Sequence, residues 1–216
     1  MSDYPLALEY MSRALDIHEE LGERYSVARV TGNLGNIYAV TDDHTQALDH
    51  YGRALSVYQE LGRTADVPMV MGNIGLAFNK KNEYPLALDY FQRALKLCSE
   101  QGNHATEVRI TGSIISVLIC MERYVEAADL LEQQAAMNMD DPGIRTSHSV
   151  NRADLSMVND DLETAKSYLQ QGLDIATSAH IRMMAASCHL RLRDLAQKRN
   201  DFAGYIVHNN EYNRIT

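Results

Sequence analysis

Apolar and small residues recur along this chain with a fixed period of forty residues. The segments DYPLALEYMSRAL, DHTQALDHYGRAL and EYPLALDYFQRAL begin at Asp3, Asp43 and Glu83. Within each unit the apolar positions are spaced three and four apart, as in Ala47, Leu48 and Tyr51, which is the spacing of an amphipathic helix. A period of this length is typical of stacked supersecondary units, so the pattern predicts an all-α fold built from antiparallel helix pairs.

The expected helix ends carry the residues that helix ends favour. Pro5 and Pro85 fall in first turns, where a missing N–H costs nothing, and Asp42 and Asp43 offer N-caps to the following helix. A glycine stands just past the second helix of three units, where a left-handed backbone ends a helix: Gly22, Gly62 and Gly102.

Small residues recur where the two helices of a unit are expected to cross. Gly35 and Gly75 take this place in the first helix. Alanines take it in the second helix, at positions 47, 54, 87 and 94. Small side chains let two backbones approach, so we predict close packing at these positions and not hinges.

The order of these residues resembles the tetratricopeptide repeat. Its pattern of a large apolar residue, a small one and an aromatic, followed by alanine, aromatic and alanine, is matched twice, by Leu34, Gly35, Tyr38, Ala47, Tyr51 and Ala54, and by Ile74, Gly75, Phe78, Ala87, Phe91 and Ala94. The forty-residue period resembles the longer variant of kinesin light chains. The resemblance implies a right-handed superhelical solenoid of about five repeats with an unpaired first helix. It weakens toward the end of the chain, where Ile115, Arg193 and Tyr205 replace small residues.

This reading makes residues 1–216 a single solenoid. The expected parts are an unpaired second helix and five repeats, the last two degenerate: residues 2–21, then 26–61, 66–101, 106–137, 144–178 and 181–216. The Asp141-Pro142-Gly143 sequence interrupts the pattern, and we expect a changed hairpin angle there.

The first predicted helix has no first-helix partner in the sequence. Leu8, Met11 and Leu15 would therefore have one side against the next helix and the other side uncovered. We expect either that the chain is a piece of a larger protein or that two chains pair as a homodimer through their uncapped terminal helices.

A second resemblance concerns the last part of the chain. The string LRDLAQKRNDFAGYIVHNNEYNRIT, residues 192–216, and the RVTGNLGNIY type of repeat are similar to the tetratricopeptide region that precedes the catalytic domain of bacterial class III adenylate and guanylate cyclases. The resemblance implies a sensory, regulatory region without cyclase activity of its own.

The candidate binding site follows from the repeat geometry. First helices line the concave side of stacked hairpins, so equivalent positions form ladders along a groove. Asparagine offers a donor and an acceptor to the backbone of an extended peptide, and arginine can pair with acidic side chains. The alternative is that these side chains are solvated or bonded within the fold. The predicted groove residues are Arg29, Asn33, Asn36, Met69, Asn73, Leu76, Arg109, Ser113, Ser116, Asn151 and Asp154.

Other classes of function find little support in the sequence. The net charge of −9 disfavours nucleic acid as a partner. The chain has no phosphate-binding loop, HExxH or GxSxG motif, and its three cysteines and eight histidines suggest no metal site, so we expect neither a catalytic site nor a cofactor. The longest apolar run is too short for a bilayer, which favours a soluble protein, and three cysteines without a disulfide pattern favour a reducing cytoplasm. The expected partner is a protein or peptide of unknown identity. The alternatives are a free-standing scaffold or assembly adaptor and a regulator that senses a small ligand or signalling peptide.

Overall fold

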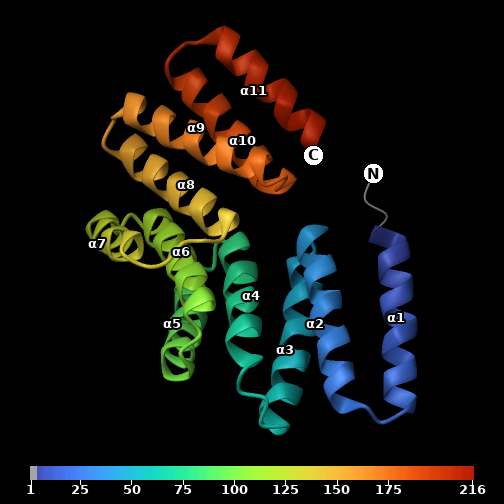
Figure 1. Ribbon diagram of the computed structural model, residues 1–216. Helices are drawn as coiled ribbons and strands as arrows, with labels where there is room; N and C mark the ends of the chain where they lie inside the picture. Colours follow the sequence, from blue (N-terminus) through green and yellow to red (C-terminus); the bar gives the residue numbers. More distant parts are fainter. Residues whose placement is uncertain (1–3) are drawn as a thin grey trace. The chain divides into compact units, whose positions relative to one another are not determined.

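The computed structural model describes residues 4–216, and all the regular structure in that range is helical (Figure 1). Residues 2 and 3, where the first predicted helix begins, lie outside the described part. The all-α prediction is confirmed. The helices are α1 (Tyr4–Glu20), α2 (Arg24–Val40), α3 (His44–Glu60), α4 (Val67–Lys80), α5 (Tyr84–Gln101), α6 (His104–Cys120), α7 (Tyr124–Ala135), α8 (Pro142–Val158), α9 (Leu162–Ser178), α10 (Arg182–Lys198) and α11 (Phe202–Ile215).

The chain divides into two compact units, residues 1–117 and residues 118–216. In the first unit each of the helices α1 to α4 packs against the helix that follows it in the chain, and in the second unit the same holds from α7 to α10. Consecutive helices are antiparallel within each unit, as Figure 1 shows. Each unit is therefore a stack of helical hairpins, as the repeat predicts.

The glycines in the first helices are required by aromatic side chains from the second helices. A β-carbon placed on Gly35 would lie 2.6 Å from a ring carbon of Tyr51, and one placed on Gly75 would lie 2.6 Å from a ring carbon of Phe91. Both rings are almost completely buried. Real β-carbons do not approach other atoms so closely, so the predicted close packing at these glycines is confirmed.

The second unit fills its interior differently. Leucines form the centre of its core, and Leu169, Leu173, Leu192 and Leu195 are among its buried members. Gly172 of α9 provides close packing, but a β-carbon there would meet small groups, Ser149 Cβ at 3.3 Å and Cys188 Sγ at 3.4 Å, and no aromatic ring.

Two kinds of turn connect the helices. The predicted left-handed glycines are confirmed, with φ values of 68° at Gly22, 66° at Gly62 and 65° at Gly102. Most of the other turns place a non-glycine residue in the same backbone region, often a short polar one that tolerates it. These residues are Asp42, Asn82, Glu122, Asp160, His180 and Asn200.

Aspartates stand in pairs before three of the helices, at positions 42–43, 140–141 and 160–161. Asp43, Asp141 and Asp161 each accept a hydrogen bond from a backbone N–H three residues later. The residues before Asp43 and Asp161, which are Asp42 and Asp160, have a left-handed backbone in the turn. The N-cap predicted at Asp43 is confirmed, whereas the N-cap predicted at Asp42 is wrong, because Asp42 lies in the turn before it with a left-handed backbone. None of the helices within residues 4–216 combines the length and apolar character that crossing a bilayer requires.

Candidate functional site on the first helices of the first unit

Nine of the predicted groove residues lie on α2, α4 and α6, three on each helix. The α2 and α4 helices are in contact, and the Asn73 Nδ2 group of α4 donates to Asn36 Oδ1 of α2 at 3.1 Å. On the other side of α4, a β-carbon on Gly72 would lie 4.0 Å from the Arg109 guanidinium of α6. The structure therefore brings residues of all three helices together around α4.

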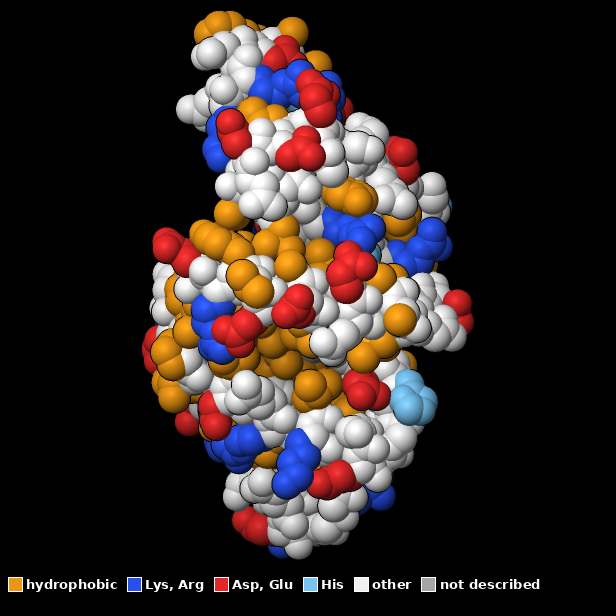
Figure 2. Space-filling model, turned by 90° about the vertical axis from the view of Figure 1, so that its left-hand side faces the viewer, with side chains coloured by type: hydrophobic (Ala, Val, Ile, Leu, Met, Phe, Trp, Pro, Cys, Tyr) orange, Lys and Arg blue, Asp and Glu red, His pale blue; other side chains and the backbone are white. Residues whose placement is uncertain are grey.

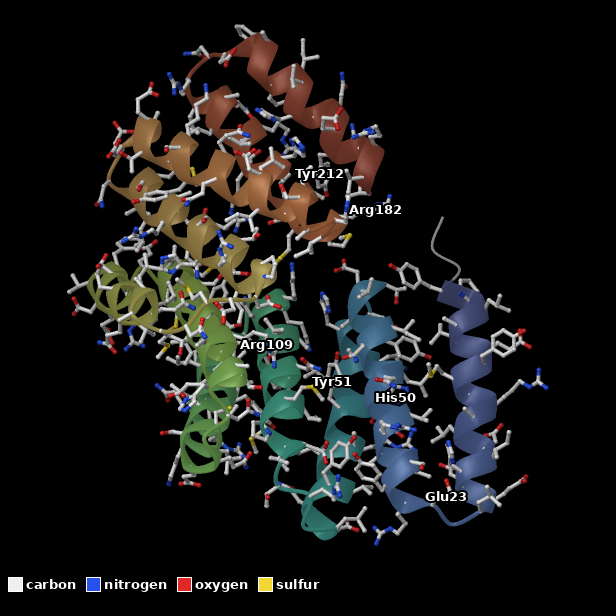
Figure 3. The ribbon with its side chains drawn as sticks, viewed as in Figure 1. Glu23, His50, Tyr51, Arg109, Arg182 and Tyr212 are labelled. Atoms are coloured by element: carbon white, nitrogen blue, oxygen red, sulfur yellow. The ribbon has the colours of Figure 1, made fainter. Side chains whose placement is uncertain are left out.

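Asn36 is the centre of a short hydrogen-bond network. Its Oδ1 atom accepts from the Tyr51 hydroxyl at 2.8 Å and from Asn73 Nδ2 at 3.1 Å. Tyr51 comes from α3, so the network joins three helices. Figure 3 labels Tyr51, and it also labels Arg109 of the neighbouring α6. Burial raises the pKa of Tyr51 to about 12, which keeps the phenol protonated and a donor at neutral pH.

The network uses only one half of each asparagine side chain. The Asn36 amide nitrogen and the Asn73 carbonyl oxygen take no part in these bonds. The nitrogen can still donate a hydrogen bond, and the oxygen can still accept one. Asn33 of α2 is exposed one turn away from Asn36. Fixed amide groups of this kind suit the N–H and C=O groups of an extended peptide, because their orientation is set before the peptide binds.

Two large apolar side chains stand on either side of Asn73 along α4. Met69 is 50% exposed and Leu76 is 39% exposed. They are seven residues apart, which is about two helical turns, so they share one face of the helix. Met adapts its shape to different partners, and this pair supplies the apolar surface that a polar network lacks.

The two helices that flank α4 each carry an arginine among the predicted residues. Arg29 of α2 is exposed and Arg109 of α6 is half-buried. The Ser113 hydroxyl donates to the Arg109 carbonyl oxygen of its own helix at 3.3 Å, so its orientation is set by α6. Ser116 is half-buried. The surface thus combines amides, apolar side chains and two guanidinium groups.

The two predicted groove residues of the second unit have different surroundings. Asn151 is buried, with 4% of its surface exposed. Asp154 accepts from Nε of Arg191 at 2.9 Å and from its Nη2 at 3.1 Å. Asn151 is thus packed in the interior, and Asp154 is held in an ion pair. The candidate site is therefore restricted to the first unit.

Some polar contacts were not anticipated from the sequence. One is the Tyr51 hydroxyl bond to Asn36, because the repeat pattern places the Tyr51 ring in the core but does not indicate a partner for its hydroxyl. The Nδ1 atoms of His189 and His208 lie 3.1 Å apart, and His148 Nδ1 lies 2.8 Å from Gln134 Oε1. Each of the two histidine contacts includes a residue of a degenerate repeat, where no periodic signal aligns the partners.

On the face drawn in Figure 2, lysine and arginine are scattered among acidic and uncharged residues. Within residues 4–216, no three histidine, cysteine, aspartate or glutamate side chains are arranged to hold a metal ion.

Comparison with known proteins places the fold. The family model described as Tetratricopeptide repeat matches residues 1–60. No curated protein sequence matches the chain.

Solved structures match over most or all of the chain at low sequence identity. Aspartyl phosphate phosphatase F from Bacillus subtilis has a TM-score of 0.81 at 14% identity, over 100% of this chain and 56% of that protein. NprR in complex with its cognate peptide NprX has a TM-score of 0.77 at 13% identity, over 96% of this chain and 65% of NprR. The TPR-like repeats of a putative kinesin light chain from P. anserina have a TM-score of 0.61 at 14% identity, over 81% of this chain and 88% of that protein.

The chain spans little more than half the length of the phosphatase and about two thirds of NprR. At these identities the likeness concerns the fold. The hairpin stacks, the glycine–aromatic contacts and the matched first sixty residues together give this chain the fold of a tetratricopeptide-repeat protein.

Proposed function

We propose that the first unit binds an extended peptide or protein segment on the face formed by α2, α4 and α6. The observation that carries the proposal is the hydrogen-bond network around Asn36, which fixes two asparagine amides beside the exposed Met69 and Leu76. In this arrangement Asn36 and Asn73, together with the exposed Asn33, bond the peptide backbone, and the two apolar residues contact its side chains. Arg29 and Arg109 favour an acidic segment.

Relatives in fold support this type of ligand. The structure of NprR was solved in complex with its cognate peptide. Its fold matches 96% of the present chain. The proposal for the present chain depends on its own residues, because identity to NprR is only 13%.

The test begins with selection from a phage-displayed library of random peptides against the whole chain. The affinity of a selected peptide is then measured by titration calorimetry for the parent chain and for the Asn33→Ala/Asn73→Ala variant. Loss of two hydrogen bonds of about 1 kcal/mol each predicts an affinity at least about tenfold lower. Asn210→Ala, an exposed asparagine of α11, is the matched control and should leave the affinity unchanged.

Two results would count against the proposed site. One is a library that yields no binder to the folded chain. The other is a binder whose affinity is the same for the Asn33→Ala/Asn73→Ala variant as for the parent, with the circular dichroism and melting temperature of the variant unchanged. The second result would place peptide binding elsewhere on the molecule.

The wider setting stays a prediction. The resemblance of residues 192–216 suggests a regulatory region of a bacterial adenylate or guanylate cyclase, and the scaffold and small-ligand alternatives share the same binding face. A class III catalytic sequence within a helical linker of Thr216 in the parent coding sequence would support the cyclase setting. Its absence there would leave the scaffold or the ligand-sensing regulator.

A further inference from the structure

The helix α1 has the sequence of a second helix but lacks the burial of one. Its Ala7, Met11 and Ala14 correspond through the forty-residue period to three positions of α3 and three of α5. Those six residues are at most 3% exposed: Ala47, Tyr51, Ala54, Ala87, Phe91 and Ala94. In the described part of α1, by contrast, no residue is buried.

In the other hairpins, two contacts from the preceding first helix cover these positions. The first is the glycine–aromatic contact, in which Tyr51 lies on Gly35 and Phe91 lies on Gly75. The second is a stacked pair one residue earlier, with His50 on Tyr38 at 5.1 Å between ring centroids. Phe78 and Tyr90 repeat the stacked pair at 5.6 Å.

The counterparts on α1 have neither contact within the first unit. Tyr10, which corresponds to His50 and Tyr90, is 59% exposed, and Met11, which corresponds to Tyr51 and Phe91, is only half-buried. Leu6 and Ile17 extend the same exposed stripe at 41% and 55%. The α2 helix packs against α1, and in Figure 1 no helix of the first unit stands on the opposite side of α1.

We propose that α1 is a docking surface for one antiparallel helix of defined chemistry. That helix carries Leu or Ile, then Gly, then an aromatic residue three positions after the Gly. The same pattern is present in Leu34-Gly35-x-x-Tyr38 and Ile74-Gly75-x-x-Phe78. The glycine receives Met11 and the aromatic ring stacks on Tyr10, which continues an interface that the chain already forms twice. This docking surface is independent of the peptide site on α2, α4 and α6.

The experiment supplies such a helix in the register of the repeat. A second copy of residues 63–82, which contains α4, is fused directly before Asp3, because Glu83 follows Asn82 in the parent and Asp3 corresponds to Glu83. The fusion is expected to raise the melting temperature by about 4 °C or more and to slow amide hydrogen exchange in α1. A control fusion carries Gly75→Ile and Phe78→Ala in the added copy only, and it should show neither change.

Two outcomes would overturn the proposal. In the first, the two fusions behave alike, whether both stabilise α1 or neither does. In the second, light scattering shows that the unfused chain is a dimer that Tyr10→Lys converts to a monomer, which would assign this face to a second copy. The expected result is a monomeric unfused chain in which α1 exchanges rapidly.

Discussion

The two units place a polar pair at the same point of the repeat but use it in opposite ways. In the first unit Asn73 of α4 bonds Asn36 of α2, and in the second unit Arg191 of α10 bonds Asp154 of α8. Both pairs join successive first helices across thirty-seven residues. The neutral amide pair leaves half of each side chain for another molecule, whereas the ion pair satisfies both partners. The same hairpin geometry thus gives an open polar face in one unit and a closed internal bond in the other.

The largest expected effect comes from breaking the pair in the second unit. Arg191→Met leaves Asp154 without its partner, with only 16% of that side chain exposed, and should lower the free energy of unfolding by about 3 kcal/mol. Asp154→Leu/Arg191→Met removes both charges and should recover most of the loss. Urea denaturation followed by circular dichroism measures both variants. A double variant no more stable than Arg191→Met would show that the pair is not the reason for the loss.

The interior of the first unit can be tested through its glycines. Gly75→Ala brings a methyl group against the Phe91 ring and should cost about 2 kcal/mol, since the buried ring has little room to move. Gly52→Ala is the matched control, because a β-carbon at Gly52 of α3 meets no atom within 4 Å. That control should gain about 0.5–1 kcal/mol from helix propensity. Equal effects of the two substitutions on urea denaturation would contradict the close-packing account.

Acidification should lower the stability of the second unit through the His189–His208 contact. Burial lowers the pKa of both imidazoles, and the nearby His189 lowers that of His208 further. Lys166 also lowers the His208 pKa, while Asp201 raises it; at His189, Glu211 raises the pKa and Arg214 lowers it.

Because each pKa is lower in the folded chain than in the unfolded chain, the unfolded state binds more protons as the pH falls below about 6.5. The contribution of the neutral histidines to the free energy of unfolding is therefore fully present above this pH and is lost as the pH falls below it. His50 and His148 have lowered pKa values as well, so the contribution of the pair is measured by difference. Urea denaturation at pH 7.5 and 5.5 should show a smaller pH effect in His208→Gln than in the parent. An identical pH effect would remove the pair as the cause.

The smallest expected effect concerns the open polar pair itself. Tyr51→Phe removes the hydroxyl donor to Asn36 but keeps the ring on Gly35, so the free energy of unfolding should fall by about 1 kcal/mol. Asn36 would still accept from Asn73. Tyr168→Phe, which removes a longer hydroxyl contact to Arg152 at 3.3 Å, is the comparison in the second unit and should cost less. The reverse order would indicate that the Asn36 network adds little to the fold.

The sequence predicted the features that repeat and missed those that occur once. Gly35 and Gly75 recur in register with aromatic residues, so their packing and the left-handed Gly22, Gly62 and Gly102 could be inferred from spacing alone. The Asp154–Arg191 pair was missed because no earlier repeat has an arginine at the position of Arg191 and a single charged residue does not reveal its partner. The groove positions were predicted by register, but register does not give burial, so Asn151 could not be distinguished from Asn73. That difference depends on neighbouring side chains, which the repeat does not conserve between units.

The central claim is that the amides of the first unit recognise a peptide while the second unit keeps its polar pair closed. Nuclear magnetic resonance of the asparagine side-chain amides, recorded while a library-selected peptide is added, tests this claim most directly. We expect saturable shifts of the Asn33, Asn36 and Asn73 signals, with the Asn151 and Asn210 signals unchanged. Shifts confined to Asn151, Asn210 or other asparagines of the second unit would contradict it.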